Sequence, residues 1–428
     1  MNPMKTISSE EITKRYLDRS TEHIQKSGKI HQKLLFLRQK SLKLMSSLIE
    51  EQVKSLDVND AKPPHVLFDH SDLIEFATGS IVKALGPEYG VYQGRRSPRI
   101  PNGDLLLMSR ILSIQGQKGN FTAPSQVTAQ YDVPADAWYF NGEVEGNLPL
   151  SILLEIALQP CGVLSAYLGT QLKYPEINYF FRNLDGQTTL NQRLDVRGKT
   201  IQTRATLLKT IFSGTTIIQH FTFELTCDGI SFYRGSSSFG YFPAELMASQ
   251  VGLDGGNPAF PWFHREGNAN DKHLLQVNAK DFQSVLPAGK LNFMEQIQLD
   301  PIGGKNEAGY IYAVRQNSKE DWYYTCHFYE DPVMPGSLGI ETIAQAAKIF
   351  AANHFVKDSR ISLAIGQELT WKYRGQVLQQ NKQMQIEIHF HKIISEGRKH
   401  YLSGDASLWA DDLRIYEVQH LTFEIEIP

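Results

Sequence analysis

Apolar residues follow two different spacings along the chain. Between Pro3 and Lys62 they recur at intervals near three and four among many Lys, Glu and Gln residues, and Gly28 is the only glycine. This pattern predicts a helical N-terminal segment over 1–62. The pattern leaves open whether that segment is a solvated spacer, docks on the rest of the protein or pairs with another helix.

Beyond the Pro63-Pro64 pair, which ends the helix, the pattern changes to alternation. The runs 216–225 and 385–391 alternate apolar and polar residues and predict strands. Each half also holds one helix-like apolar segment, so the class is α+β. A stretch rich in Gly, Asn and Pro divides the halves, and the predicted domains are 63–250, a linker at 251–271, and 272–428.

An internal repeat relates the two halves. The segment LLLMSRI at 105–111 matches LNFMEQI, which begins 186 positions later at residue 291. The same offset superposes four residues of the first half on four of the second: Pro149, Ser151, Glu155 and Gln159 on Pro335, Ser337, Glu341 and Gln345. We therefore expect two copies of one fold.

Composition narrows the class of protein. The 428 residues are 41% hydrophobic, and 43 Lys and Arg against 46 Asp and Glu leave a formal charge of −3. That balance argues against nucleic-acid binding. The three cysteines are too far apart for a metal site or a disulfide framework, which favours a cytoplasmic location. No uncharged apolar run reaches about 18 residues, so neither a membrane span nor a signal peptide is expected.

One segment carries the candidate chemistry. Residues 322–341 read as a strand end, a turn and then a helix that starts near Pro335-Gly336, because proline is favoured in a first helical turn. The amides at that start would be unpaired donors. A carbonyl placed there would meet these donors and the positive end of the helix dipole.

The stretch CHFYEDPVMPGSLGIE at 326–341 resembles the active-site segment of hotdog-fold 3-hydroxyacyl-[acyl-carrier-protein] dehydratases, in particular the 3-hydroxydecanoyl dehydratase/isomerase type. FATGS at 76–80, GPEY at 86–89 and residues 99–111 are similar to the same family's N-terminal helix and first strand. As a pair, the copies look most like the dehydratase didomain of polyunsaturated fatty acid synthases. The resemblance implies a double hotdog, two antiparallel sheets joined side by side, each around a long helix.

The resemblance also implies residue roles. His327 stands at the catalytic base, Gly336 at the glycine whose amide binds the thioester carbonyl, and Glu341 at the helix carboxylate that acts as acid. Because the family pairs the base of one hotdog with the acid of the other, we expect His327 to act with Glu155. The further substrate-binding residues implied are Cys326, Pro335 and Gln159.

The second possible site, which pairs position 141 of the first copy with Glu341 of the second, is expected to be vestigial. The repeat places Asn141 where the second copy has His327, and asparagine cannot serve as the base. Leu150 stands in the place of Gly336. The pair Asn141 and Glu341 should therefore be inactive.

The activity implied is dehydration of a carrier-bound 3-hydroxyacyl thioester to the 2-enoyl thioester, without metal or organic cofactor, since the phosphopantetheine arm arrives on the carrier. An acyl carrier protein and other synthase domains are the implied partners. Arg95, Arg96 and Arg99 are either solvated or a dock for the acidic carrier. Thioester hydrolysis and a degenerate carrier-binding scaffold are the alternatives. Isomerisation of the double bond, acyl length and homodimer formation stay open.

Overall fold

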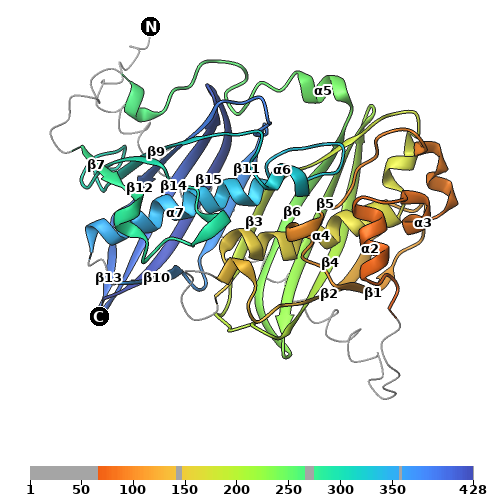
Figure 1. Cartoon of the computed structure of the whole chain (residues 1–428), viewed down its shortest axis with the longest axis horizontal. Helices are drawn as coiled ribbons and strands as arrows, with labels where there is room; N and C mark the ends of the chain where they lie inside the picture. The colour runs from red at the N-terminus through yellow and green to blue at the C-terminus, as the bar shows by residue number, and fades with distance from the viewer. Residues whose placement is uncertain (1–65, 141–146, 266–273, 356–358, 428) are drawn as a thin grey trace, which may run out of the picture. The chain divides into compact units, whose positions relative to one another are not determined.

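The computed structural model describes residues 66–140, 147–265, 274–355 and 359–427, which belong to the unit His65–Pro428 (Figure 1). The predicted helical segment 1–62 lies outside the described residues, as does Asn141. The fold of the described part is built from two halves that repeat one arrangement.

Each half contains one long helix and a set of strands. The elements of the first half are α2 (His70–Ala77), α3 (Ile81–Leu85), β1 (Arg110–Gln115), β2 (Ser125–Asp132), α4 (Leu150–Tyr167), β3 (Phe180–Leu190), β4 (Thr200–Ser213), β5 (Thr216–Cys227) and β6 (Ile230–Phe242). After α5 (Ala244–Ala248), the second half has β7 (Leu275–Asn278), β8 (Gln296–Asp300), β9 (Tyr310–Gln316), α6 (Tyr323–Cys326), α7 (Gly336–His354), β10 (Arg360–Leu363), β11 (Glu368–Tyr373), β12 (Gln383–Phe390), β13 (Ile394–Glu396), β14 (Lys399–Ala410) and β15 (Leu413–Glu426).

The strands of both halves form one antiparallel sheet. Its order is β1-β2-β4-β5-β6-β3-β11-β15-β14-β12-β9-β8-β7, with β10 added beside β15 and β13 beside β14. The seam between the halves is the pairing of β3 with β11. These two strands hold matching places in the two halves, so the halves join as in a two-fold dimer. The predicted double hotdog with side-by-side sheets is confirmed.

The chain between the halves has no regular strand among its described residues. β6 ends at Phe242 and β7 begins at Leu275, with α5 between them. The predicted linker, 251–271, falls in this stretch. The division of the chain at those boundaries stays a prediction.

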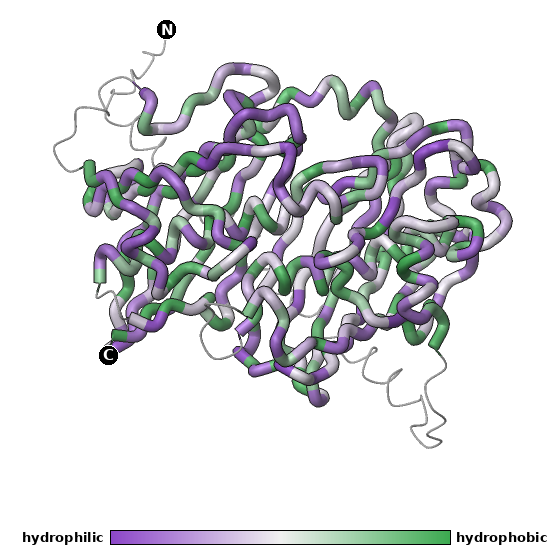
Figure 2. The backbone as a smooth tube through the Cα atoms, in the orientation of Figure 1, coloured by the Kyte–Doolittle hydropathy of each residue, from purple (hydrophilic) through white to green (hydrophobic). Residues whose placement is uncertain are grey.

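Sequence pattern explains how strands and helices pack. β5 buries every second side chain, as its alternation predicts, and Figure 2 shows such alternation of green and purple along the strands. α4 is apolar on nearly all sides and is buried along its length, as expected for a helix enclosed by a sheet. The stretch Leu150–Lys173 is long and apolar enough to cross a membrane, but 83% of its most apolar window is buried inside the protein.

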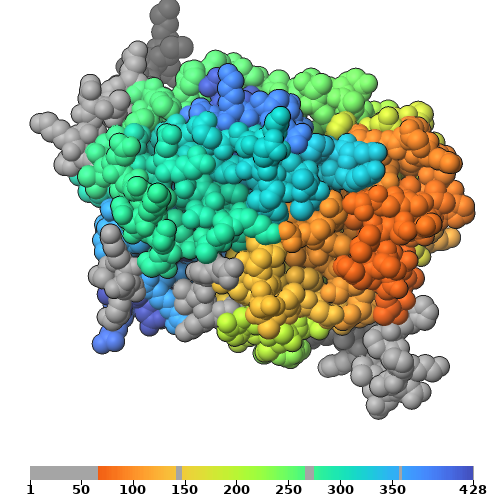
Figure 3. All heavy atoms as spheres, viewed as in Figure 1, coloured from red at the N-terminus to blue at the C-terminus, as the bar shows by residue number. Residues whose placement is uncertain are grey.

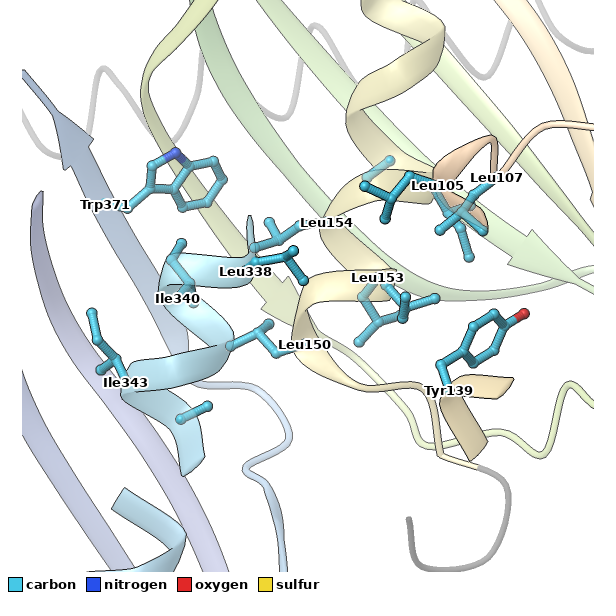
Figure 4. Packing of buried hydrophobic residues seen from close by; sticks show 14 of the residues in the cluster. Leu105, Leu107, Tyr139, Leu150, Leu153, Leu154, Leu338, Ile340, Ile343 and Trp371 are labelled. Carbon is cyan, nitrogen blue, oxygen red and sulfur yellow. The ribbon is translucent and has the colours of Figure 1, made fainter. Parts of the chain in front are cut away.

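The N-terminal ends of α4 and α7 pack against each other, close to the strand β11 that forms the seam. Figure 4 shows Leu150 and Leu154 of α4 beside Leu338 and Ile340 of α7, with Trp371 of β11 nearby. All five side chains are buried. The two central helices therefore share one hydrophobic core, which brings the first turns of the two repeats together.

The outer face of β12 departs from the alternation expected for 385–391. Gln385, Glu387 and His389 are all buried there, not exposed. The chain after α5 covers them: the amide of Trp262 donates to Glu387 at 2.6 Å, and His264 bonds the hydroxyl of Tyr312, which donates to Gln385. The linker thus bonds Glu387 directly, whereas Gln385 bonds Tyr312 and the carbonyl of Asp411, and Nδ1 of His389 accepts from the amide of Lys305. Among the described residues no group of three or more His, Cys, Asp or Glu side chains is arranged to hold a metal ion.

The seam depends on a glycine. Gly186 of β3 lies opposite Trp371 of β11, and a Cβ at Gly186 would collide with the indole ring. Trp371 is buried and its indole nitrogen donates to Asn183 at 2.8 Å. We expect Gly186→Ala to lower the free energy of unfolding by about 1–3 kcal/mol, the usual cost of overpacking. Denaturant unfolding measures this, with Gly90→Ala as the control because a Cβ there meets nothing within 4 Å. Equal stability of the two variants would contradict this account of the seam.

Candidate active site

A cavity of about 400 Å³ lies between the two halves. Its lining includes Glu155 and Gln159 from α4 of the first half. From the second half come His327, which follows α6, and Gly336 and Ser337 at the start of α7. Side chains from both copies of the repeat therefore meet in one space, as the cross-copy pairing predicts.

His327 is held in one protonation and tautomer state. Its Nδ1 lies 2.9 Å from the carbonyl oxygen of Val333. Because a carbonyl can only accept, Nδ1 carries the proton and Nε2 keeps a free lone pair. Burial lowers the pKa of His327 from 6.5 to about 3. The ring is therefore neutral at physiological pH and can act as a proton acceptor through Nε2.

Glu155 is a buried carboxyl group whose pKa is raised by its surroundings. The side chain is buried, and burial raises its pKa, although hydrogen bonds from Gln159 and Ser337 act in the opposite direction. The hydroxyl of Ser337 donates to Oε1 at 2.6 Å, and Nε2 of Gln159 donates to Oε2 at 2.9 Å. Ser337 belongs to the second half, so this contact links the acid directly to the helix that follows His327.

The orientation of Gln159 is fixed by the backbone. Its Oε1 accepts from the amide of Leu107 at 3.0 Å and its Nε2 donates to the carbonyl of Leu105 at 2.6 Å. The NH₂ group must therefore face Glu155. Gln159 lines the cavity, and its hydrogen bond to Glu155 positions the carboxyl group.

The start of α7 is open toward the cavity. The helix begins at Gly336 after Pro335, as the sequence predicts, and the amide of Leu338 donates to the carbonyl of Pro335 at 3.1 Å. The first amides of a helix, here those of Gly336 and Ser337, have no acceptor one turn earlier within the helix. A Cβ at Gly336 would collide with the ring of Tyr373, which also lines the cavity. Glycine is thus required for the close approach of β11, and its amide can face a ligand carbonyl.

The surroundings of Glu341, the repeat counterpart of Glu155, differ from those of Glu155. Glu341 is buried and accepts from the amide of Ser151 at 3.1 Å and from Gln345 at 3.3 Å. The cavity beside it has only about 50 Å³ and is lined in part by Leu150, the counterpart of Gly336. Asn141, the residue expected opposite Glu341, lies outside the described residues. A more polar cavity of about 480 Å³ adjoins it and shares Asn147, Arg193, Leu194 and Ser362 with its lining.

Two of the predicted substrate-binding residues do not line the cavity. Cys326 uses its carbonyl to accept from the amide and the side chain of Asn102, at 2.8 and 3.0 Å, and so ties the halves together. Pro335 caps α7 from outside the cavity. Neither residue is among those that line the cavity, and a role of Cys326 and Pro335 in substrate binding stays a prediction.

Sequence reasoning gave no role to two residues of the site. Ser337 appeared only as one position of the repeat, matched to Ser151, yet its hydroxyl bonds Glu155. Tyr373 comes from β11 and lies within the cavity wall. The match of Ser337 to Ser151 in the repeat could have pointed to Ser337, whereas no local sequence pattern distinguishes Tyr373.

The basic cluster is integrated into the fold rather than solvated. Arg95 donates to the carbonyls of Pro175 and Glu176, and Arg96 donates to that of Asn178. Arg99 donates to backbone carbonyls near α2 and also lines the cavity. These three guanidinium groups therefore hold loops of the first half together.

Comparison with known proteins agrees with this geometry. Residues 286–419 match the model of the FabA-like domain. Over 396 residues the chain is 33% identical to a subunit of the polyunsaturated fatty acid synthase of Thraustochytrium sp.; the match covers 86% of this chain and 26% of that protein. The chain thus spans about a quarter of that relative's length.

Two solved structures are similar to this chain at low sequence identity and low TM-score. The dehydratase domain of RzxB from Pseudomonas fluorescens has a TM-score of 0.42 at 9% identity, over 75% of this chain and 99% of that one. The dehydratase domain from the CurJ module of the curacin polyketide synthase has a TM-score of 0.40 at 11% identity, over 76% and 97%. The family model and the sequence relative carry the comparison: residues 286–419 are similar to the FabA-like domain, in a chain that is similar to part of a polyunsaturated fatty acid synthase subunit.

Proposed function

We propose that this chain dehydrates a 3-hydroxyacyl thioester to the 2-enoyl thioester in fatty acid or polyketide-like lipid biosynthesis. The observation that carries the proposal is the cavity shared by a neutral His327 from the second half and a buried Glu155 from the first. A base and an acid with opposed pKa shifts in one apolar space are the groups that a hydro-lyase needs.

The reaction is proposed to proceed by transfer of one proton on each side of the substrate. Nε2 of His327 takes the proton on the α carbon, and the electrons of that bond form the double bond as the bond between the β carbon and oxygen breaks. The carboxyl group of Glu155 gives its proton to the departing hydroxyl, which leaves as water. His327 is then protonated and Glu155 ionised, and one proton passing between them restores the site.

The start of α7 would stabilise the charge that develops on the thioester oxygen. The amide of Gly336 and the positive end of the helix dipole act on an oxyanion without any reorganisation of the protein. The same amides would also acidify the α proton, because they polarise the carbonyl. A weak base such as a buried neutral imidazole can then remove that proton.

The proposal extends to cofactor and partners. The proposed steps use only side chains and backbone amides, so we expect no resident metal ion or organic cofactor. We propose that the thioester arrives on the phosphopantetheine arm of an acyl carrier protein or carrier domain, next to other domains of a cytoplasmic synthase. Product analysis would decide whether the double bond is also moved from position 2 to position 3.

The experiment is to incubate the purified chain with a 3-hydroxyacyl thioester and follow the absorbance of the conjugated enoyl product. We expect enoyl thioester and water, with the thioester bond intact. Release of free acid would favour the thioester hydrolase instead. Binding without either product would favour a carrier-binding scaffold, and both results would contradict the proposed dehydration.

A further inference from the structure

One wall of the cavity comes from the end of the first hotdog and the start of the linker. From the last residue of β6 onward, the segment 242–252 contributes several of its lining residues, including Phe242, Leu246, Met247 and Val251. Figure 1 shows α5 in this segment, set apart from both central helices, and Figure 3 shows the green chain around it along the upper edge of the molecule. We refer to residues 242–252 as the linker wall.

The linker wall has a different chemical character from the catalytic part of the cavity. The four side chains named above are apolar, and the other residues that it contributes to the lining are Ser249, Gln250 and Gly252. No residue of the linker wall that lines the cavity is titratable, whereas Glu155 and His327 come from other elements. The linker wall is thus suited to contact a hydrocarbon, not the reacting atoms.

Two of these apolar side chains are partly exposed without a ligand. Leu246 is 49% exposed and Val251 is 52% exposed. An alkyl chain in the cavity would remove part of that surface from water, and each buried methylene contributes about 0.8 kcal/mol. The empty protein therefore leaves apolar surface that a longer ligand covers better than a short one.

The linker wall is anchored on the second half. Arg414 of β15 forms a two-point ion pair with Asp254, at 2.8 and 2.6 Å, and its carbonyl accepts from the amide of Leu253 at 2.9 Å. Gly252 has a φ of +68° and a Cβ there would lie 2.7 Å from the same carbonyl. These contacts lie at the last residue of the linker wall and at the two residues that follow it. They fix the position of the linker wall relative to the cavity.

We infer that the linker wall contacts the acyl chain of the substrate and sets the preference for its length. This inference rests on the proposed function, because it assumes that the ligand is an acyl thioester. It assigns specificity to the connection between the hotdogs, so two chains with identical catalytic residues could differ in the acyl length that they accept.

Two variants test the inference through substrate length. Leu246→Ala removes an apolar contact, and Met247→Trp fills space in the cavity. For both, we expect kcat/KM for a ten-carbon 3-hydroxyacyl thioester to fall by about 10-fold or more, since one methylene in an apolar pocket changes specificity by about 10–200-fold. For a four-carbon substrate we expect a change of less than about 3-fold, because a short chain does not reach the linker wall.

A matched control separates this effect on substrate length from the effect of removing any half-exposed leucine side chain. Leu208 of β4 is 50% exposed, like Leu246, but it is outside the cavity lining. Leu208→Ala should leave the ratio of the two substrates unchanged. An equal loss for both substrates in Leu246→Ala, or an unchanged ratio in both linker-wall variants with a normal melting temperature, would overturn the inference.

Binding of an inert long-chain acyl thioether, measured by calorimetry, keeps this test separate from the proposed function. If the parent chain forms no enoyl product, the dehydration proposal fails. Weaker binding of the ten-carbon thioether to Leu246→Ala, but not to Leu208→Ala, would still support the linker wall as an acyl contact. Equal binding to the two variants would overturn it.

Discussion

His327→Asn is expected to reduce kcat for dehydration by at least about 10²–10⁴-fold, the range typical of a general base. The substitution places in the second copy the residue that the repeat has at position 141. An asparagine amide can still donate to the carbonyl of Val333, which now accepts from Nδ1 of His327 at 2.9 Å. It has no nitrogen lone pair that accepts a proton at neutral pH. The loss would therefore be chemical and not structural.

Single-turnover measurement of enoyl formation checks this expectation, with the melting temperature as the control for folding. His327→Ala provides a second variant. It leaves the Val333 carbonyl without its partner, which costs about 1–3 kcal/mol for a buried group. Near-normal turnover by a folded His327→Asn protein would contradict the role of His327 as the base.

Glu155→Gln is expected to lower kcat by about 10²–10⁴-fold, whereas Glu341→Gln should stay within a few-fold of the parent. Glutamine at 155 keeps the hydrogen bonds: its oxygen can accept from Gln159, and its NH₂ group can donate to the hydroxyl of Ser337, which accepts as well as donates. What it lacks is the proton for the leaving hydroxyl. The variant should fold normally and turn over slowly.

Glu341→Gln should instead keep its activity and lose stability. Both carboxylate oxygens of Glu341 face groups that can only donate in their present orientation, the amide of Ser151 and the NH₂ of Gln345. The orientation of Gln345 is fixed, because its Oε1 accepts from the amide of Phe293 and its Nε2 donates to the carbonyl of Leu291. A glutamine at 341 would place an NH₂ group against one donor, at a cost of about 1–3 kcal/mol in stability.

The pair of variants thus separates catalysis from packing through two measurements, kcat and the free energy of unfolding. A large loss of activity in Glu341→Gln with normal activity in Glu155→Gln would show that each hotdog works with its own carboxyl group. The cross-copy site would then be wrong.

The sequence predicts those features of the site that depend on local backbone preferences or on the internal repeat. Proline followed by glycine marks the start of α7 because both residues have strong backbone preferences. The repeat placed Glu155 and Glu341 at matching positions, and the family resemblance added that acid and base come from different copies. The structure brings Glu155 and His327 into one cavity as that combination implies.

Long-range contacts explain what the sequence did not predict. The polar residues of β12 are buried because the chain around Trp262 packs on their face, a contact that no periodicity encodes. The contribution of Met247 to the cavity depends likewise on where the linker runs.

The seam between β3 and β11 has an evolutionary consequence. When two identical chains associate about a two-fold axis, every substitution appears on both sides, and a lost base is lost from both centres. Here the two partners are encoded separately within one polypeptide, and the pairing of β3 with β11 keeps them together. Selection can then preserve the base in one half and the acid in the other, while the residues around Glu341 adapt to packing alone. Under the proposed function, we expect this pair of hotdogs to hold one reaction centre and to process one acyl chain at a time.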